Sequence, residues 1–183
     1  MKKQLTTKRI VMIALFTALI AVGAFIRIDT PVMSFTLQFL FVIAAGLILG
    51  KIDGPISVVV YIVLGLIGLP VFARGGGVAY VLQPSFGYIL AFVLSAYICG
   101  RLSEKGASSS KKDFQKMVCA SLVALVVEYG IGMAYYWALS TFYFGQNLEL
   151  KQLMMYCVIL VLPGDFLSCL IAAAVSKRIK ILQ

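Results

Sequence analysis

Two acidic side chains inside apolar segments are the residues most able to do chemistry in this chain. Glu128 and Asp165 are the only charged residues well inside those segments, where a charge costs about 2.5 kcal/mol or more at the centre of a bilayer. Asp165 follows Pro163 and Gly164, which break or restart a helix and leave N–H groups beside its carboxylate. That carboxylate either caps the helix or accepts hydrogen bonds from the N–H groups of a ligand. Ser168 shares its helical face and can add a hydroxyl.

Glu128 lies near the middle of its apolar segment, and the sequence leaves its role open. A protonated glutamate that bridges two helices and a glutamate that binds a ligand or relays protons are both consistent with a buried acid. We therefore place Asp165 in the predicted site and leave Glu128 outside it.

Missing residue types exclude several classes of function. The chain has no histidine, which removes the usual metal ligand and the commonest general base. Its four cysteines lie scattered in apolar segments without a CxxC pair, so neither a zinc site nor a disulfide framework is indicated. Residues 46–52 approach a phosphate loop, but only three residues separate the glycines and Ile52 replaces the magnesium-binding Ser or Thr. We expect no enzymatic activity, no metal, no cofactor and no ATP binding by this chain itself.

The segment from Gly65 to Tyr88 is the other unusual feature. It holds two prolines, three consecutive glycines and one arginine between two very apolar stretches. A break in the helix is costly beside a membrane, because it leaves backbone polar groups unsatisfied unless the segment forms a structure that pairs them. Glycines let backbone N–H groups approach a ligand closely, so we interpret this segment as part of a ligand pocket.

The elements that position these residues are predicted to be membrane-spanning helices. Hydrophobic residues make up 62% of the 183 residues and charged residues 13%, which is too little polar surface for a soluble globule. A spanning helix takes about 20 apolar residues, because its backbone groups must be satisfied internally. We predict an all-α, polytopic membrane protein with a single integral membrane domain over residues 1–183. Its six transmembrane helices are predicted at residues 9–26, 35–50, 54–72, 85–102, 114–141 and 154–176.

Basic residues set the predicted orientation. Most of the 16 lysines and arginines precede the first span, follow the last, or lie between spans two and three or four and five. By the positive-inside rule that side is cytoplasmic, which places both termini in the cytoplasm. The formal charge of +9 then follows from topology, and the chain has no polar domain that could bind nucleic acid. The pocket segment lies on the outer side, where the loop Arg27 to Ser34 can close over it.

Several motifs together resemble one known family. GLPVF followed by glycines, PSFGY at Pro84 to Tyr88, PVMSFTLQFLFVIAAGLILG at Pro31 to Gly50 and LPGD at Leu162 to Asp165 are similar to the BioY family. That family comprises the biotin-specific S components of energy-coupling-factor (ECF) vitamin transporters. The resemblance covers essentially the whole chain. It implies a six-helix S component in a prokaryotic cell membrane that binds biotin from outside with high affinity for uptake.

The resemblance also implies partners. Transport would use an ECF membrane coupling subunit and two ATPase subunits, so ATP would enter only through those partners. Ala14 and Ala18 form a small-xxx-small pair on the first helix, where the family contacts its coupling subunit. Internal packing of the bundle explains such a pair equally well, and Gly46 with Gly50 is a weaker second candidate. An S component for another vitamin is the alternative function.

Biotin's groups can be matched to the residues. Its ureido N–H groups need an acceptor, its ureido carbonyl a donor, its rings an apolar slot and its carboxylate a cation or helix N-terminus. The predicted substrate-binding residues are the acceptor Asp165, the donors Gln38 and Ser168, the aromatic residues Phe72, Tyr80 and Tyr88, the glycines Gly75 and Gly76, and Arg74.

One position departs from the family pattern. The family carries a lysine three residues after the aspartate of PGD, and this chain has Ser168 there. The cation that would pair with the biotin carboxylate or balance Asp165 is therefore missing. Arg74 is the nearest replacement by topology, although an arginine at a helix end is also an ordinary interfacial anchor.

Overall fold

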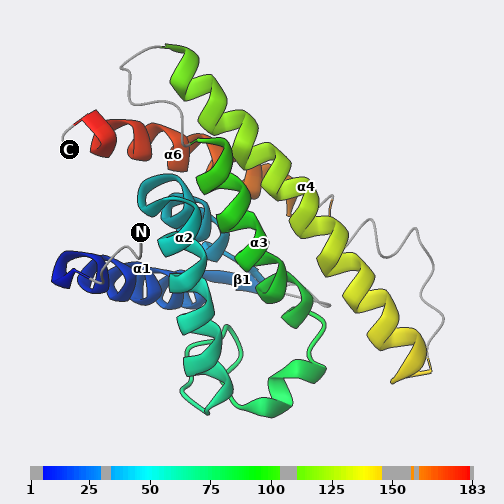
Figure 1. The fold of residues 1–183 in the computed structure, drawn as a ribbon. Helices are drawn as coiled ribbons and strands as arrows, with labels where there is room; N and C mark the ends of the chain where they lie inside the picture. The colour runs from blue at the N-terminus through cyan, green and yellow to red at the C-terminus, as the bar shows by residue number, and fades with distance from the viewer. Residues whose placement is uncertain (1–5, 30–33, 104–110, 146–157, 159–160, 182–183) are drawn as a thin grey trace.

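Figure 1 shows the computed structural model of the chain, which describes residues 6–29, 34–103, 111–145, 158 and 161–181. Its α-helices are α1 (Thr7–Phe25), α2 (Gln38–Leu66), α3 (Phe86–Leu102), α4 (Lys111–Phe142) and α6 (Leu162–Ile181). An antiparallel hairpin of β1 (Arg27–Asp29) and β2 (Ser34–Thr36) follows α1, and the 3₁₀ helix η1 (Val78–Leu82) precedes α3. The described residues thus form a helical bundle, as predicted, with one small hairpin that the sequence analysis did not predict.

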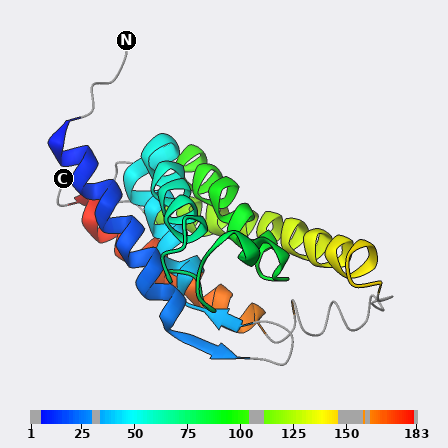
Figure 2. The same cartoon turned by 90° about the horizontal axis from the view of Figure 1, so that it is seen from below.

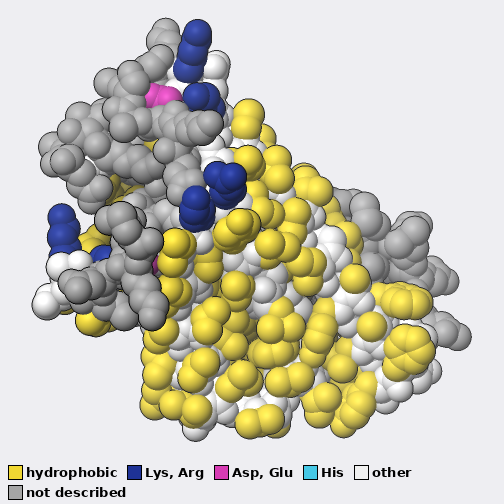
Figure 3. Space-filling view, in the orientation of Figure 1, with side chains coloured by type: hydrophobic (Ala, Val, Ile, Leu, Met, Phe, Trp, Pro, Cys, Tyr) yellow, Lys and Arg dark blue, Asp and Glu magenta, His cyan; other side chains and the backbone are white. Residues whose placement is uncertain are grey.

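The bundle has the surface of a membrane protein. Within the described part of the chain, α1, α2 and α4 are long and apolar enough to cross a membrane, and α3 is a shorter apolar helix. Large hydrophobic side chains such as Val11, Val63 and Val126 are exposed on the outside. Figure 3 shows hydrophobic side chains over most of one face, with the Lys and Arg side chains gathered toward one end. Such a surface requires lipid around it.

The predicted spans correspond to these helices. Residues 9–26, 85–102 and 114–141 match α1, α3 and α4 closely. The sixth span, residues 154–176, is matched by α6 from Leu162 on, and its earlier part lies largely outside the described residues. The second and third spans both overlap α2, so the six-span count is consistent with the structure. Figures 1 and 2 show the start of α1 and the end of α6 on the same side of the bundle.

A sharp break at Gly50 divides α2 into two helical segments. Gly50 has φ 86° and ψ −175°, a conformation that essentially only glycine adopts. A Cβ on Gly54 would lie 2.9 Å from the Cα of Gly46, whereas eight residues of straight helix would separate these glycines by about 12 Å. The chain therefore turns back on itself at Gly50, the residue at which the second span is predicted to end.

Two predicted boundaries are wrong. The second span was predicted from Phe35, which pairs with Ile28 in the hairpin instead, and α2 begins at Gln38. The third span was predicted to Phe72, but α2 ends at Leu66 and Gly68 follows with φ 108°. A positive φ reverses the chain direction at no steric cost for glycine, so Phe72 lies in a loop despite its apolar surroundings in the sequence.

Close contacts between backbones hold the helices together. A Cβ on Gly46 would meet the Ala96 carbonyl and Cys99 of α3, so Gly46 is occupied by packing within the bundle. At the end where the basic residues gather, Arg9 of α1 forms an ion pair with Asp53 of α2, with Nη2 2.5 Å from Oδ1. These contacts fix α1, α2 and α3 relative to one another. The cavity described below lies at the starts of α2 and α3.

Candidate ligand-binding site

A cavity lies where the first turns of three helices meet the middle of α4. Its empty space, with the open solvent at its mouth included, measures about 590 Å³. The residues that line it are Thr36, Gln38, Phe39, Ala73, Tyr80, Ser85, Tyr88, Ile89, Phe92, Glu128, Tyr129, Val161 and Asp165. Helix N-termini present N–H groups and favour negative charge. The N-termini of α2, α3 and α6 all contribute lining residues to the cavity.

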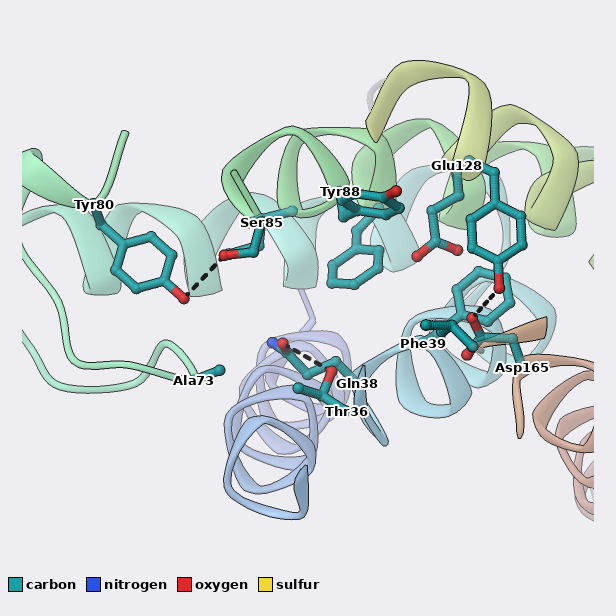
Figure 4. A pocket seen from close by; sticks show the side chains of 13 residues that line it. Thr36, Gln38, Phe39, Ala73, Tyr80, Ser85, Tyr88, Glu128 and Asp165 are labelled. Carbon is teal, nitrogen blue, oxygen red and sulfur yellow. Dashed lines mark hydrogen bonds between the residues drawn. The ribbon is translucent and has the colours of Figure 1, made fainter. Parts of the chain in front are cut away.

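One end of the cavity carries two carboxyl groups. Asp165 lies in the first turn of α6 and is only 3% exposed, and its Oδ2 accepts a hydrogen bond of 2.7 Å from the hydroxyl of Tyr129. Glu128, the residue before that tyrosine on α4, is also 3% exposed. Figure 4 shows both carboxyl groups at the same end of the cavity, Glu128 from α4 and Asp165 from α6. This end can accept hydrogen bonds from the N–H groups of a ligand.

Gln38 supplies the polar side of the cavity at the start of α2. Its Nε2 donates a hydrogen bond of 2.6 Å to the hydroxyl of Tyr61, and its Oε1 accepts one of 3.3 Å from the hydroxyl of Thr36. Tyr61 in turn donates to the carbonyl of Val71. These contacts fix the amide orientation, and an amide nitrogen carries two hydrogens, so one N–H of Gln38 can still serve a ligand.

Aromatic rings form the remaining walls. Tyr88 of α3 and Tyr129 of α4 pack edge to face with centroids 6.3 Å apart. Tyr80 of η1 lies at the other end of the cavity, with its hydroxyl 3.4 Å from that of Ser85 (Figure 4). Phe72 packs behind Tyr80, 4.5 Å between centroids, and is fully buried without lining the cavity. The cavity is thus an apolar slot with acids at one end and hydroxyls at the other.

Comparisons with known proteins agree with this architecture. A profile of the BioY family matches residues 1–183. The chain belongs to the BioY family. The BioY protein of Lysinibacillus sphaericus, a probable biotin transporter, is 38% identical over 179 residues, which cover 98% of this chain and 90% of that protein. The biotin transporter BioY of Thermotoga maritima is 37% identical over 127 residues, 69% of this chain and 72% of that protein.

A solved structure agrees with the fold of this BioY-family protein. The crystal structure of the S-component for biotin from an ECF-type ABC transporter superimposes with a TM-score of 0.81 at 26% sequence identity. The match covers 97% of this chain and 95% of that one. The likeness therefore extends to the whole bundle, including the helices that surround the cavity.

Four of the predicted site residues meet in the cavity: Asp165, Gln38, Tyr80 and Tyr88. The prediction drew on rare polar side chains and on the unusual segment from Gly65 to Tyr88, and both contribute to the lining. In this BioY-family protein the segment from Gly65 to Tyr88 and the PGD motif are far apart in sequence, and both contribute to the same cavity.

The other predicted residues lie outside the cavity lining. Ser168 is buried on α6, one turn after Asp165. Arg74 and Gly75 line a separate outer groove together with Arg27, and a Cβ on Gly76 would meet the carbonyl of Leu69. Ala73, however, borders both the groove and the cavity, so the predicted arginine follows a residue of the cavity wall directly in the chain.

Ala14 and Ala18 are exposed on α1, whereas their neighbours Ile13, Phe16 and Thr17 are buried. The described bundle therefore does not use this alanine pair for internal packing, which was the alternative explanation. The two alanines lie on the exposed face of the helix among larger exposed side chains such as Leu15 and Val22, and small residues at such a position let another helix approach closely.

Sequence reasoning missed Glu128 and Tyr129 as cavity residues. Periodicity cannot reveal which face of α4 turns inward, because the helix is apolar on nearly all sides. The only available signal was the rarity of an acid within a spanning segment, and it does not distinguish a cavity from a helix contact. Thr36 and Ser85 were also missed: Thr36 lies in the hairpin that was not predicted, and a serine at a helix start is an ordinary capping residue.

Proposed function

We propose that this protein is the biotin-binding S component of an ECF transporter and acts in biotin uptake. The observation that carries the proposal is the buried Asp165, held by Tyr129 at the end of an apolar cavity, in a chain whose relatives are named biotin transporters. The family model and the named relatives are those of a transporter, so we propose no enzymatic role for this chain.

The groups of biotin fit the cavity in one direction. The ureido N–H groups meet Asp165, and the thioether ring lies against the rings of Phe39, Tyr88 and Phe92, which all line the slot. The valerate chain then extends toward Tyr80, because Figure 4 shows the acids and this tyrosine at opposite ends. This arrangement gives the ureido N–H groups of the ligand an acceptor and buries its apolar rings.

The carboxylate of biotin reaches the outer end of the cavity in this arrangement. Tyr80 and Ser85 offer hydroxyls there, and the N-terminus of α3 contributes favourable partial charge. Arg74 lies one residue beyond Ala73, which borders the cavity. We propose that Arg74 provides the cation for this carboxylate in place of the lysine missing at position 168.

We further propose the predicted orientation and partners. Both termini would lie in the cytoplasm of a prokaryotic cell, and the cavity would open outward. A coupling subunit would dock on the exposed pair Ala14 and Ala18, and two ATPases would supply the energy. A fluorescent protein fused to the C-terminus should then mature in the cytoplasm, and a signal only from a periplasmic or surface reporter would contradict the orientation.

Equilibrium binding of labelled biotin to the purified protein tests the function. Wild type should bind with high affinity. Asp165→Asn should weaken binding about 10- to 100-fold, because it removes a charged acceptor of hydrogen bonds. Asp113→Asn is the matched control, since Asp113 is buried on α4 outside the cavity. Arg74→Ala should weaken binding about tenfold.

The same assay separates biotin from other vitamins. Competition by unlabelled riboflavin, thiamine or folate should be negligible, because none of them combines a cyclic urea with an aliphatic carboxylate. A folded wild-type protein that binds one of these and not biotin would replace the proposal with the alternative S component. A folded protein that binds none would refute both.

A further inference from the structure

Glu128 is a second acid in the cavity that the fit of biotin described above does not use. Its Oε2 is fully buried and has no hydrogen-bond partner among the residues that the structure describes. Figure 4 shows its carboxyl group directed into the cavity, at the end where Asp165 and Tyr129 form their hydrogen bond. A buried oxygen without a partner is unfavourable, which indicates a partner that arrives with the ligand.

Charge at this end of the cavity is unbalanced. The described lining contains Glu128 and Asp165 but no lysine or arginine, and Ser168, one turn further along α6, is neutral. Two ionised carboxylates in one low-dielectric space repel each other, and neither is compensated by a cation there. One of the two acids therefore keeps its proton.

The surroundings indicate which acid is ionised. Asp165 accepts the hydrogen bond of Tyr129 and lies in the first turn of α6, where the helix dipole stabilises a negative charge. Glu128 lies in the interior of α4, far from either end of that helix, and its Oε2 accepts no hydrogen bond from the residues that the structure describes. The ionised form is thus favoured at Asp165, and the proton belongs on Glu128.

A protonated carboxyl group is a hydrogen-bond donor. We propose that Glu128 is a neutral carboxylic acid and donates its O–H to the carbonyl oxygen of the ligand's cyclic urea, while Asp165 accepts an adjacent N–H. This assignment rests on the proposed function. The urea presents its carbonyl and N–H groups in one plane, so a donor from α4 and an acceptor from α6 recognise it together and reject rings that lack either group.

Substitution of Glu128 separates this role from that of an ionised acceptor. Glu128→Gln keeps the size, the neutral charge and an N–H donor, so it should bind labelled biotin within about threefold of wild type. Glu128→Leu removes the donor from a buried site and should bind about tenfold more weakly. Asp165→Asn should lose affinity although it is the same acid-to-amide change, because Asp165 acts in its ionised form.

Difference infrared spectroscopy at neutral pH reports the proton directly. The band of a protonated carboxyl group should be present in wild type, absent in Glu128→Gln and retained in Asp165→Asn. It should move to lower frequency when biotin binds, because the O–H gains an acceptor. The infrared test does not require the variants to fold, because the wild-type band and its shift on biotin binding already show whether a protonated carboxyl group contacts the ligand.

Two results would overturn the inference while the proposed function survives. One is wild-type protein that binds biotin but shows no protonated carboxyl band that responds to it. The other is Glu128→Gln that melts at the wild-type temperature yet loses affinity tenfold or more, which would make Glu128 an ionised acceptor. Failure of wild type to bind biotin would instead refute the proposed function.

Discussion

Gly132 provides the sharpest test of how the cavity wall is built. This buried glycine of α4 lies directly beneath the ring of Tyr88 from α3, and a Cβ at this position would come within 2.5 Å of three atoms of that ring. The ring has little room to retreat, because it is only 8% exposed and packs edge to face against Tyr129. Gly132→Ala must therefore push Tyr88 into the cavity or separate α3 from α4.

The change in stability expected for Gly132→Ala is the sum of two opposing effects. Overpacking in a well-packed interior costs about 1 to 3 kcal/mol, whereas replacement of glycine by alanine within a helix gains about 0.8 to 1 kcal/mol. At Gly132 both apply, so the net loss of stability should be about 0 to 2 kcal/mol. At Gly130 only the gain applies, because a Cβ there would meet no atom within 4 Å. The two variants should thus differ by about 1 to 3 kcal/mol.

Thermal unfolding in detergent and equilibrium binding of biotin measure the two consequences. Gly130→Ala should melt at or above the wild-type temperature and keep its affinity. Gly132→Ala should melt lower than Gly130→Ala and bind biotin about tenfold more weakly, because a displaced Tyr88 narrows the slot. Equal melting temperatures and equal affinities for the two variants would refute the packing of α3 on α4 described above.

Four further substitutions test three separate parts of the structure. Tyr129→Phe removes the donor to Asp165 and should weaken biotin binding about tenfold in calorimetric titration; an unchanged affinity would show that this hydrogen bond does not prepare the site. Arg9→Met and Asp53→Asn each break a partly buried ion pair with side chains 20% and 16% exposed. Each should lower the melting temperature, and the double variant should lose less than the sum of the two single losses; strict additivity in thermal unfolding would contradict the pair. Gly50→Ala places a side chain at φ 86° and should cost about 1 to 3 kcal/mol, so a variant as stable as wild type would argue against the sharp break in α2.

Local features of the sequence predicted much of the fold and part of the site. The apolar stretches indicated the helices because a spanning segment must satisfy its own backbone, and the chain turns back at Gly50, where the second span was predicted to end. Asp165 stood out because an acid inside a spanning segment is rare. Residues such as Gln38 and Tyr88 were predicted from the groups that a ligand requires, and the structure places both in the cavity.

The third span shows where hydropathy alone fails. Phe72 continues an apolar run in the sequence, so the run was read as helix through this residue. In the structure the ring of Phe72 returns to pack on Gly65 and Tyr80 from a loop. Burial in a loop and burial in a helix give the same hydropathy, and only the backbone reversal at Gly68 distinguishes them.

The sequence by itself determined that this is a multi-helix membrane protein, where most of its helices lie, and that Asp165 is exceptional. Each of these depends on the properties of a residue and its near neighbours in the chain. The tertiary structure alone decided that Glu128 and Tyr129 share a cavity with Asp165, and that Arg74 lies outside it. Those facts depend on how α4 is rotated and how closely α3 and α6 approach it, which side-chain packing fixes between segments far apart in sequence.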